Sequence, residues 1–174
     1  MGRIGQIVAA SGNLGQMYAR QLLNGVTSAN YARLARPGGQ VVQSNHAAFV
    51  LGHLALYPAR VLERLGRPTG ATAVPAAYSK LFEPGAECRD DPNATLYPAL
   101  EELTTRFFDG YATALSAVSE ATDEQLLGPT PAEGRSRELF PTIGAMLSFY
   151  VAGHVWTHLG QFSAWRRCLG LPAA

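Results

Sequence analysis

Apolar residues recur every three or four positions along several stretches of the chain, and Gly and Pro lie between these stretches. This spacing gathers the apolar side chains on one face of an α-helix. We therefore predict four long helices, over residues 14–26, 45–65, 96–118 and 141–169, and a short helical turn over residues 124–127. Thr122 followed by Gln125 fits a capping box at the start of the short turn. Strand-like runs at residues 40–42 and 72–74 are too short to build a sheet.

The same pattern predicts which side chains face the core. In the first helix these are Leu14, Met17, Tyr18, Leu22 and Leu23. In the last helix they form a stripe that includes two histidines: Leu147, Val151, His154, His158, Phe162, Trp165 and Leu169. Pro58 lies inside the second predicted helix and cannot donate a backbone hydrogen bond to Leu54. That helix should therefore kink or end just after His53.

Four amphipathic helices without a sheet predict an all-α fold, a four-helix bundle. The connection over residues 66–94 is long enough to cross over between the second and third helices. With 174 residues, 47% hydrophobic and 16% charged, the chain has the size and balance of one globular domain, and we expect a single domain over residues 1–174.

Charge and composition argue against several classes of protein. The 14 basic and 13 acidic side chains give a net charge of +1, without a basic run that would bind a row of phosphates, so nucleic acid is not an expected partner. No stretch reaches the roughly 20 apolar residues of a membrane span, and the first residues do not resemble a signal peptide. We expect a cytoplasmic protein without a membrane partner. The two cysteines form neither a disulfide framework nor a CxxC motif.

A glycine-containing segment near the start, IVAASGNLGQ, is similar to the first strand and turn of a dinucleotide-binding fold. Gly12 and Gly15 do not complete the GxGxxG pattern, and alternating strands and helices do not follow. We therefore do not expect a dinucleotide cofactor.

The histidines are the strongest chemical signal in the sequence. His154 and His158 stand four residues apart, so on a helix their imidazoles lie on one face, one turn apart. His53 offers a third nitrogen from another long helix, and a bundle core can bring the two helices together. Burying imidazoles without partners costs roughly 1–3 kcal/mol for each polar group. The pattern therefore predicts a divalent metal site, and three imidazoles with an open position would suit Zn²⁺, Ni²⁺ or Fe²⁺.

Several roles around this site stay open at the level of sequence. The residues between His154 and His158 include no carboxylate, so the HExxH mechanism of zinc proteases is not supported. A base would have to be metal-bound hydroxide or a carboxylate from elsewhere, such as Glu63, Glu83 or Glu87. Gln161 could bond a ligand or a metal-bound water, or simply another helix. His46, seven residues before His53, could be a fourth ligand or could contact a ligand from outside the site, although its position at a first turn favours solvent.

Four segments of the chain resemble the DinB-like superfamily of metal-dependent helical bundles. They are the LGH that ends at His53, FEPGAECRDDPNATLYPALEEL, ATDEQLLGPTP, and GHVWTHLGQFSAWRRCLG near the C-terminal end. The resemblance implies a four-helix bundle of this type, metal-ligand roles for His53, His154 and His158, and a homodimer. It does not imply one reaction, because the family includes thiol-dependent transferases and isomerases together with members that have no established activity.

Two functional hypotheses follow. The chain could be a metal-dependent enzyme, such as a transferase that uses a low-molecular-weight thiol on a small-molecule substrate. It could instead be a non-catalytic or stress-associated protein in which the metal site is structural or vestigial. An open ligand position beside a pocket would favour the first hypothesis, and a closed site would favour the second.

Overall fold

Helices provide the regular structure of residues 2–174, the part of the chain that the computed structural model describes, and this part contains no strand. The α-helices are α1 (Arg3–Leu22), α2 (Ala47–Leu54), α3 (Tyr57–Arg64), α4 (Ala77–Phe82), α5 (Leu100–Glu120), α6 (Asp123–Leu127), α7 (Gly134–Leu139), α8 (Ile143–Ser148) and α9 (His154–Cys168). The short elements η1 (Pro37–Gly39) and η2 (Gly70–Thr72) are 3-10 turns, and the π-helical segment η3 (Phe149–Gly153) joins α8 to α9. The predicted all-α fold is confirmed.

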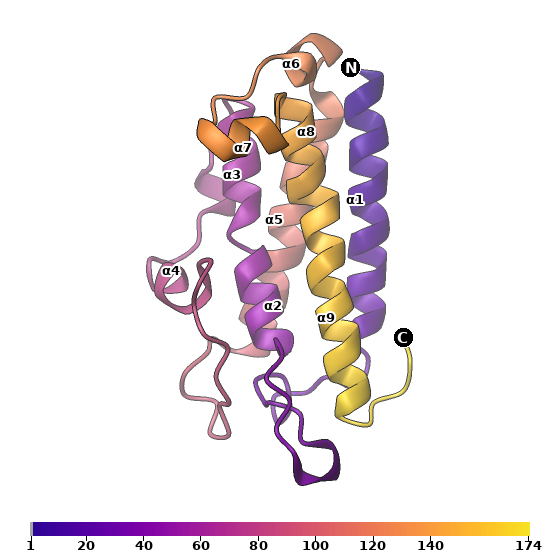
Figure 1. Ribbon diagram of the computed structural model, residues 1–174, viewed down its shortest axis with the longest axis vertical. Coiled ribbons are helices and arrows are strands. Elements are labelled where there is room, and N and C mark those ends of the chain that lie inside the picture. Colours follow the sequence, from indigo (N-terminus) through magenta and orange to yellow (C-terminus); the bar gives the residue numbers. More distant parts are fainter. Residues whose placement is uncertain (1) are drawn as a thin grey trace.

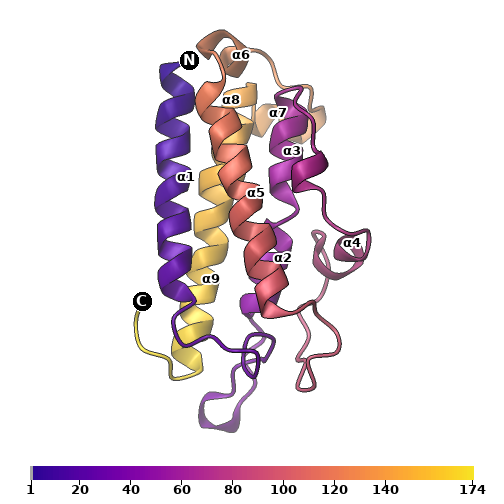
Figure 2. The ribbon, with the colours of Figure 1, turned by 180° about the vertical axis from the view of Figure 1, so that it is seen from behind.

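The long axis of the molecule is followed by α1, α5 and α9, and by the pair α2–α3 (Figure 1). Helix α9 continues the run that begins with α8 and passes through η3. Figure 2, seen from behind, shows α5 in front, with α1 on one side of it and α2–α3 on the other. Helix α9 packs against both α1 and α2, so the predicted histidine helices are neighbours.

Helix α1 begins at Arg3, well before the predicted start, and the dinucleotide-like segment is part of it. Its glycines let the backbones approach closely: a Cβ at Gly5 would overlap the Val118 carbonyl, and one at Gly12 would overlap Leu115. The predicted core face was wrong in part, since Leu14 is 58% exposed and other residues of α1 face the core. The tight packing of α1 leaves room on its inner face for small residues, so several larger ones point outward.

Pro58 divides the second predicted helix as expected. Helix α2 ends at Leu54, and Pro58 occupies the first turn of α3, where its missing N–H costs no helical hydrogen bond. The start of α2 also has a defined cause, because the His46 side chain accepts a hydrogen bond from Phe49 N and caps the helix.

The later predicted helices are also present. Helix α5 buries Leu103, Phe107 and Tyr111 from the predicted face. The Thr122 hydroxyl accepts from Gln125 N at the start of α6, as the capping box predicts. The last predicted helix is interrupted by η3, where the backbone forms a π-helix before His154.

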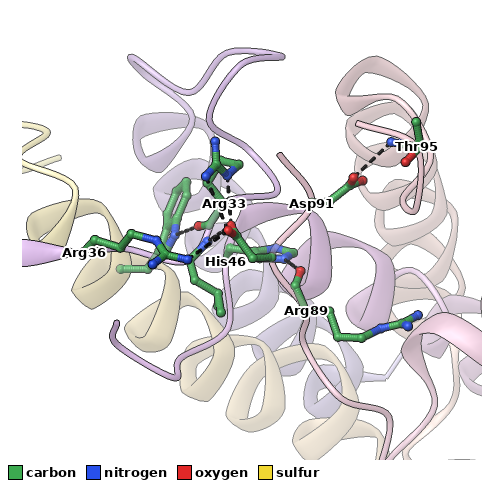
Figure 3. A network of polar contacts seen from close by, with 9 residues as sticks. Arg33, Arg36, His46, Arg89, Asp91 and Thr95 are labelled. Carbon is green, nitrogen blue, oxygen red and sulfur yellow. Dashed lines mark hydrogen bonds and ion pairs between the residues drawn. The ribbon is translucent and has the colours of Figure 1, made fainter. Parts of the chain in front are cut away.

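The connection between α3 and α5 contains η2 and α4 and is anchored by polar contacts. The carboxylate of Asp91 accepts from the backbone N–H of Thr95, and Figure 3 shows this contact beside the His46–Arg89 contact. In the described residues, no helix has the length and apolar character required to cross a membrane.

Candidate metal centre

The three predicted histidines meet between α2 and α9. His53 lies in the last turn of α2, and His154 and His158 lie in the first two turns of α9. The Nε2 atom of His154 lies 3.2 Å from Nε2 of His53 and 3.0 Å from Nε2 of His158. One ligand atom from each residue can be chosen so that all lie within 4.8 Å of one another. The structure therefore brings together the same three residues that the sequence singled out.

The outer ring nitrogens explain why Nε2 faces inward. Nδ1 of His53 donates to the carbonyl oxygen of Phe82 at 2.6 Å, which leaves the lone pair on Nε2. Nδ1 of His158 lies 2.9 Å from the carboxamide oxygen of Gln161, an acceptor. Nδ1 of His154 is buried and has no hydrogen-bond partner among residues 2–174. Two of the three rings are thus oriented by groups outside the triad.

Burial keeps the triad neutral. Burial, together with the neighbouring His158 and His53, lowers the pKa of His154 to about 3. Burial and the nearby His53 together lower the pKa of His158 to about 4, and burial lowers the pKa of His53. Neutral imidazole is the form that binds metal ions, so the three side chains are available as ligands at neutral pH.

A pocket of about 400 Å³ opens beside the triad. Aromatic side chains and the Glu83–Ala86 segment form much of its wall, and its lining includes Asn45, Phe49, Tyr57, Glu83, Phe149 and the three histidines. The Glu83 carboxylate is held by the guanidinium of Arg60 at 2.7 Å, and that guanidinium lies over the Tyr57 ring. The pocket thus combines three imidazoles, an aromatic wall and a fixed carboxylate.

The family model described as the DinB superfamily matches residues 14–162. The chain belongs to this superfamily. The residues matched by the DinB model include all three histidines of the triad. A search of curated proteins found no match.

Within this DinB chain, His46 lies outside the triad, and its side chain is buried, although its sequence position favoured solvent. Its Nδ1 caps α2, and its Nε2 donates to the carbonyl oxygen of Arg89 at 2.9 Å (Figure 3). Both ring nitrogens are therefore occupied by backbone groups. The sequence spacing placed His46 on the face of His53, but His46 precedes the helix and does not follow its periodicity.

The three carboxylates that the sequence left open as possible bases differ in their distance from the triad pocket. Glu83 lines the pocket of the DinB triad, whereas Glu63 and Glu87 are exposed and do not line it. Sequence reasoning missed the Phe82 carbonyl and Asn45. A backbone acceptor has no residue-specific signal, and Asn45 reaches the site only because α2 packs against α9.

Proposed function

We propose that the chain binds one divalent metal ion, Zn²⁺, Ni²⁺ or Fe²⁺, through the Nε2 atoms of His53, His154 and His158. The convergence of three neutral imidazoles carries this proposal. Imidazole nitrogens suit these ions, and three protein ligands leave a coordination position for water or substrate. When bound, the ion would act as a Lewis acid or lower the pKa of a bound water.

The proposed architecture around the site is a four-helix bundle of the DinB type. Its helices would be α1, α2–α3, α5 and α8–η3–α9, with residues 66–94 as the crossover and residues 1–174 as one domain. The side-by-side arrangement of these segments supports it (Figure 2). The homodimer that the family resemblance implies stays a prediction.

The pocket supports an enzyme that acts on a small molecule. Phe49, Tyr57 and Phe149 would hold an apolar part of the substrate, while Glu83 offers a carboxylate that can accept a proton. A transferase that uses a low-molecular-weight thiol fits this arrangement: the thiol sulfur forms a bond to an electrophilic carbon, the leaving group departs, and the thiol proton passes to a base. A screen of common cellular thiols with electrophilic substrates tests this reaction class.

A structural metal site is the alternative, and the buried positions of His53 and His154 favour it. In that case metal removal by a chelator lowers the thermal unfolding temperature, and the thiol screen gives no turnover. Turnover that disappears with the metal supports the enzyme.

Metal analysis of protein purified without an affinity tag is the first test of the site. We expect close to one equivalent of metal in the wild type, and much less in His154→Ala and His158→Ala, because each variant leaves two ligands. His46→Asn is the matched control: asparagine keeps a capping side chain outside the triad, so metal content should be retained. Equal metal content in the wild type and both triad variants would contradict the proposal.

A further inference from the structure

Two carboxamides link His158 to the start of α2. The Gln161 side-chain oxygen lies 2.9 Å from Nδ1 of His158 and accepts a second hydrogen bond from the Asn45 side-chain nitrogen, also at 2.9 Å. Gln161 stands one turn after His158 on α9, and Asn45 lies just before α2 and lines the triad pocket. The hydrogen bonds from Asn45 to Gln161 and from Gln161 to His158 therefore connect the pocket wall to a proposed metal ligand.

We propose that Asn45 and Gln161 form a carboxamide clamp that holds His158 in the tautomer with its proton on Nδ1. Gln161 is then a positioning residue, and it keeps the Nε2 lone pair of His158 directed at the metal ion. This inference rests on the proposed metal site, because its functional consequence is metal affinity. The tautomer itself is a property of the protein without metal.

The direction of the Gln161 carboxamide decides the tautomer. With its oxygen toward His158, only a protonated Nδ1 can make the bond, and Nε2 is free to bind an ion. If the amide were reversed, its nitrogen would donate to Nδ1, and the ring proton would move to Nε2, where it blocks coordination. In the structure the Asn45 amide nitrogen, a donor, faces the Gln161 oxygen, and this second hydrogen bond fits the first arrangement.

The orientation of the His158 ring depends on side chains, whereas that of the His53 ring depends on a backbone group. His53 is oriented by the Phe82 carbonyl, a backbone acceptor that cannot reverse its role. His158 is oriented by a side-chain amide that can rotate, so it requires a second residue to fix the amide. Asn45 is that residue.

The first experiment reads the tautomer in metal-free protein. Long-range ¹H–¹⁵N correlation spectra at neutral pH distinguish a proton on Nδ1 from one on Nε2 for each histidine. We expect His158 in the Nδ1–H form in the wild type and in Gln161→Glu, and a mixture of tautomers in Gln161→Leu and Asn45→Ala. Thr157→Ala, an exposed position on the same helix, is the matched control and should keep the wild-type pattern. Circular dichroism confirms that each variant is folded.

The second experiment measures affinity for Co²⁺ from its visible absorption bands. We expect Gln161→Leu to weaken binding about 10- to 100-fold, with altered bands, and Gln161→Glu to bind at least as tightly as the wild type, because a carboxylate also accepts from Nδ1. The Nε2–H form of His158 in the wild type, or unchanged tautomer and affinity in Gln161→Leu, overturns the clamp. If the wild type fails to bind Co²⁺ while Gln161→Leu still loses the Nδ1–H tautomer, the metal site fails and the clamp stands.

Discussion

At the scale of single residues, Gly52 determines how closely α4 can approach His53. A Cβ at Gly52 would overlap the ring of Phe82, and the Phe82 carbonyl is the group that orients His53. Because Gly52 has no side chain, the Phe82 ring can pack against α2 while the Phe82 carbonyl accepts from His53.

Gly52→Ala should displace Phe82 and disturb both contacts. We expect a loss of about 1–3 kcal/mol in the free energy of unfolding, the usual cost of overpacking, together with weaker metal binding. Urea denaturation and Co²⁺ titration measure the two effects. Gly160→Ala is the matched control, since a Cβ there meets no other residue within 4 Å and alanine favours a helix. A variant Gly52→Ala as stable as the wild type would contradict this account.

The candidate ligands could be predicted at this scale because residue type and helical spacing carry the signal. His154 and His158 share a face by sequence spacing alone, and His53 lies inside an apolar predicted helix, whereas His46 lies at the first turn of that helix. The contacts that orient them could not be predicted. They come from a backbone carbonyl and from two carboxamides that only the packing of α2 against α9 brings together.

At the scale of elements, Arg166 joins the C-terminal ends of α1 and α9. Its side chain is 1% exposed, and its guanidinium donates to the carbonyl oxygens of Leu22 and Asn24, at the end of α1, and of Pro172 in the tail. Leu22 lies in the last turn of α1, where carbonyl groups lack helical partners, and Asn24 and Pro172 follow the ends of α1 and α9. Arg166 thus supplies the end of α1 with the partners that the helix itself cannot provide.

Arg166→Met should lower the free energy of unfolding by about 2–4 kcal/mol, because buried carbonyl groups lose charged donors while the side-chain volume is largely kept. Arg167→Met, the exposed neighbour on the same helix, should stay within about 0.5 kcal/mol of the wild type. Guanidinium denaturation compares the two variants. Similar stability in both would show that the contacts of Arg166 contribute little.

Element boundaries were predictable where local signals set them. Pro58 divides the second helix and Thr122 begins α6, as their chemistry requires. The start of α1 was missed because glycines usually indicate turns, whereas Gly5 and Gly12 serve here as close-packing positions. The π-helical segment before His154 was also missed. An extra residue in a helical turn leaves no pattern that distinguishes it from a continuous helix.

At the scale of the whole molecule, two adjacent aspartates, one through its carboxylate and one through its backbone, attach the connection before α5 to the loop after α1. Asp90 pairs with Arg33 at 2.9 Å and accepts from the backbone N–H of Leu34, and the backbone N–H of Asp91 donates to the carbonyl of Ala32. This connection also supplies the Glu83–Ala86 wall of the pocket. Tertiary contacts between loops far apart in sequence have no local signal, so this attachment could not be predicted from the sequence.

The Asp90 attachment should make stability depend on pH in the acid range. The hydrogen bond from Arg33, with those from Leu34 N and Arg36, lowers the pKa of Asp90 to about 2, below its usual value of 3.8. A carboxyl group whose pKa is lower in the folded state stabilises the fold above its unfolded pKa, and the contribution disappears as the pH falls toward 2. Because Arg33 and Arg36 are 34% and 51% exposed, solvent screening reduces the contribution to about 1–2 kcal/mol.

We therefore expect Asp90→Asn to be less stable than the wild type by about 1–2 kcal/mol at pH 7, with the difference shrinking between about pH 4 and pH 2. Urea denaturation across this pH range measures it. Asp109→Asn is the matched control, because Asp109 is exposed and has no ion pair within 4 Å among the described residues. Its difference from the wild type should stay small at every pH. A constant difference for Asp90→Asn would mean that the asparagine disturbs packing and that the charge of Asp90 does not hold the two loops together.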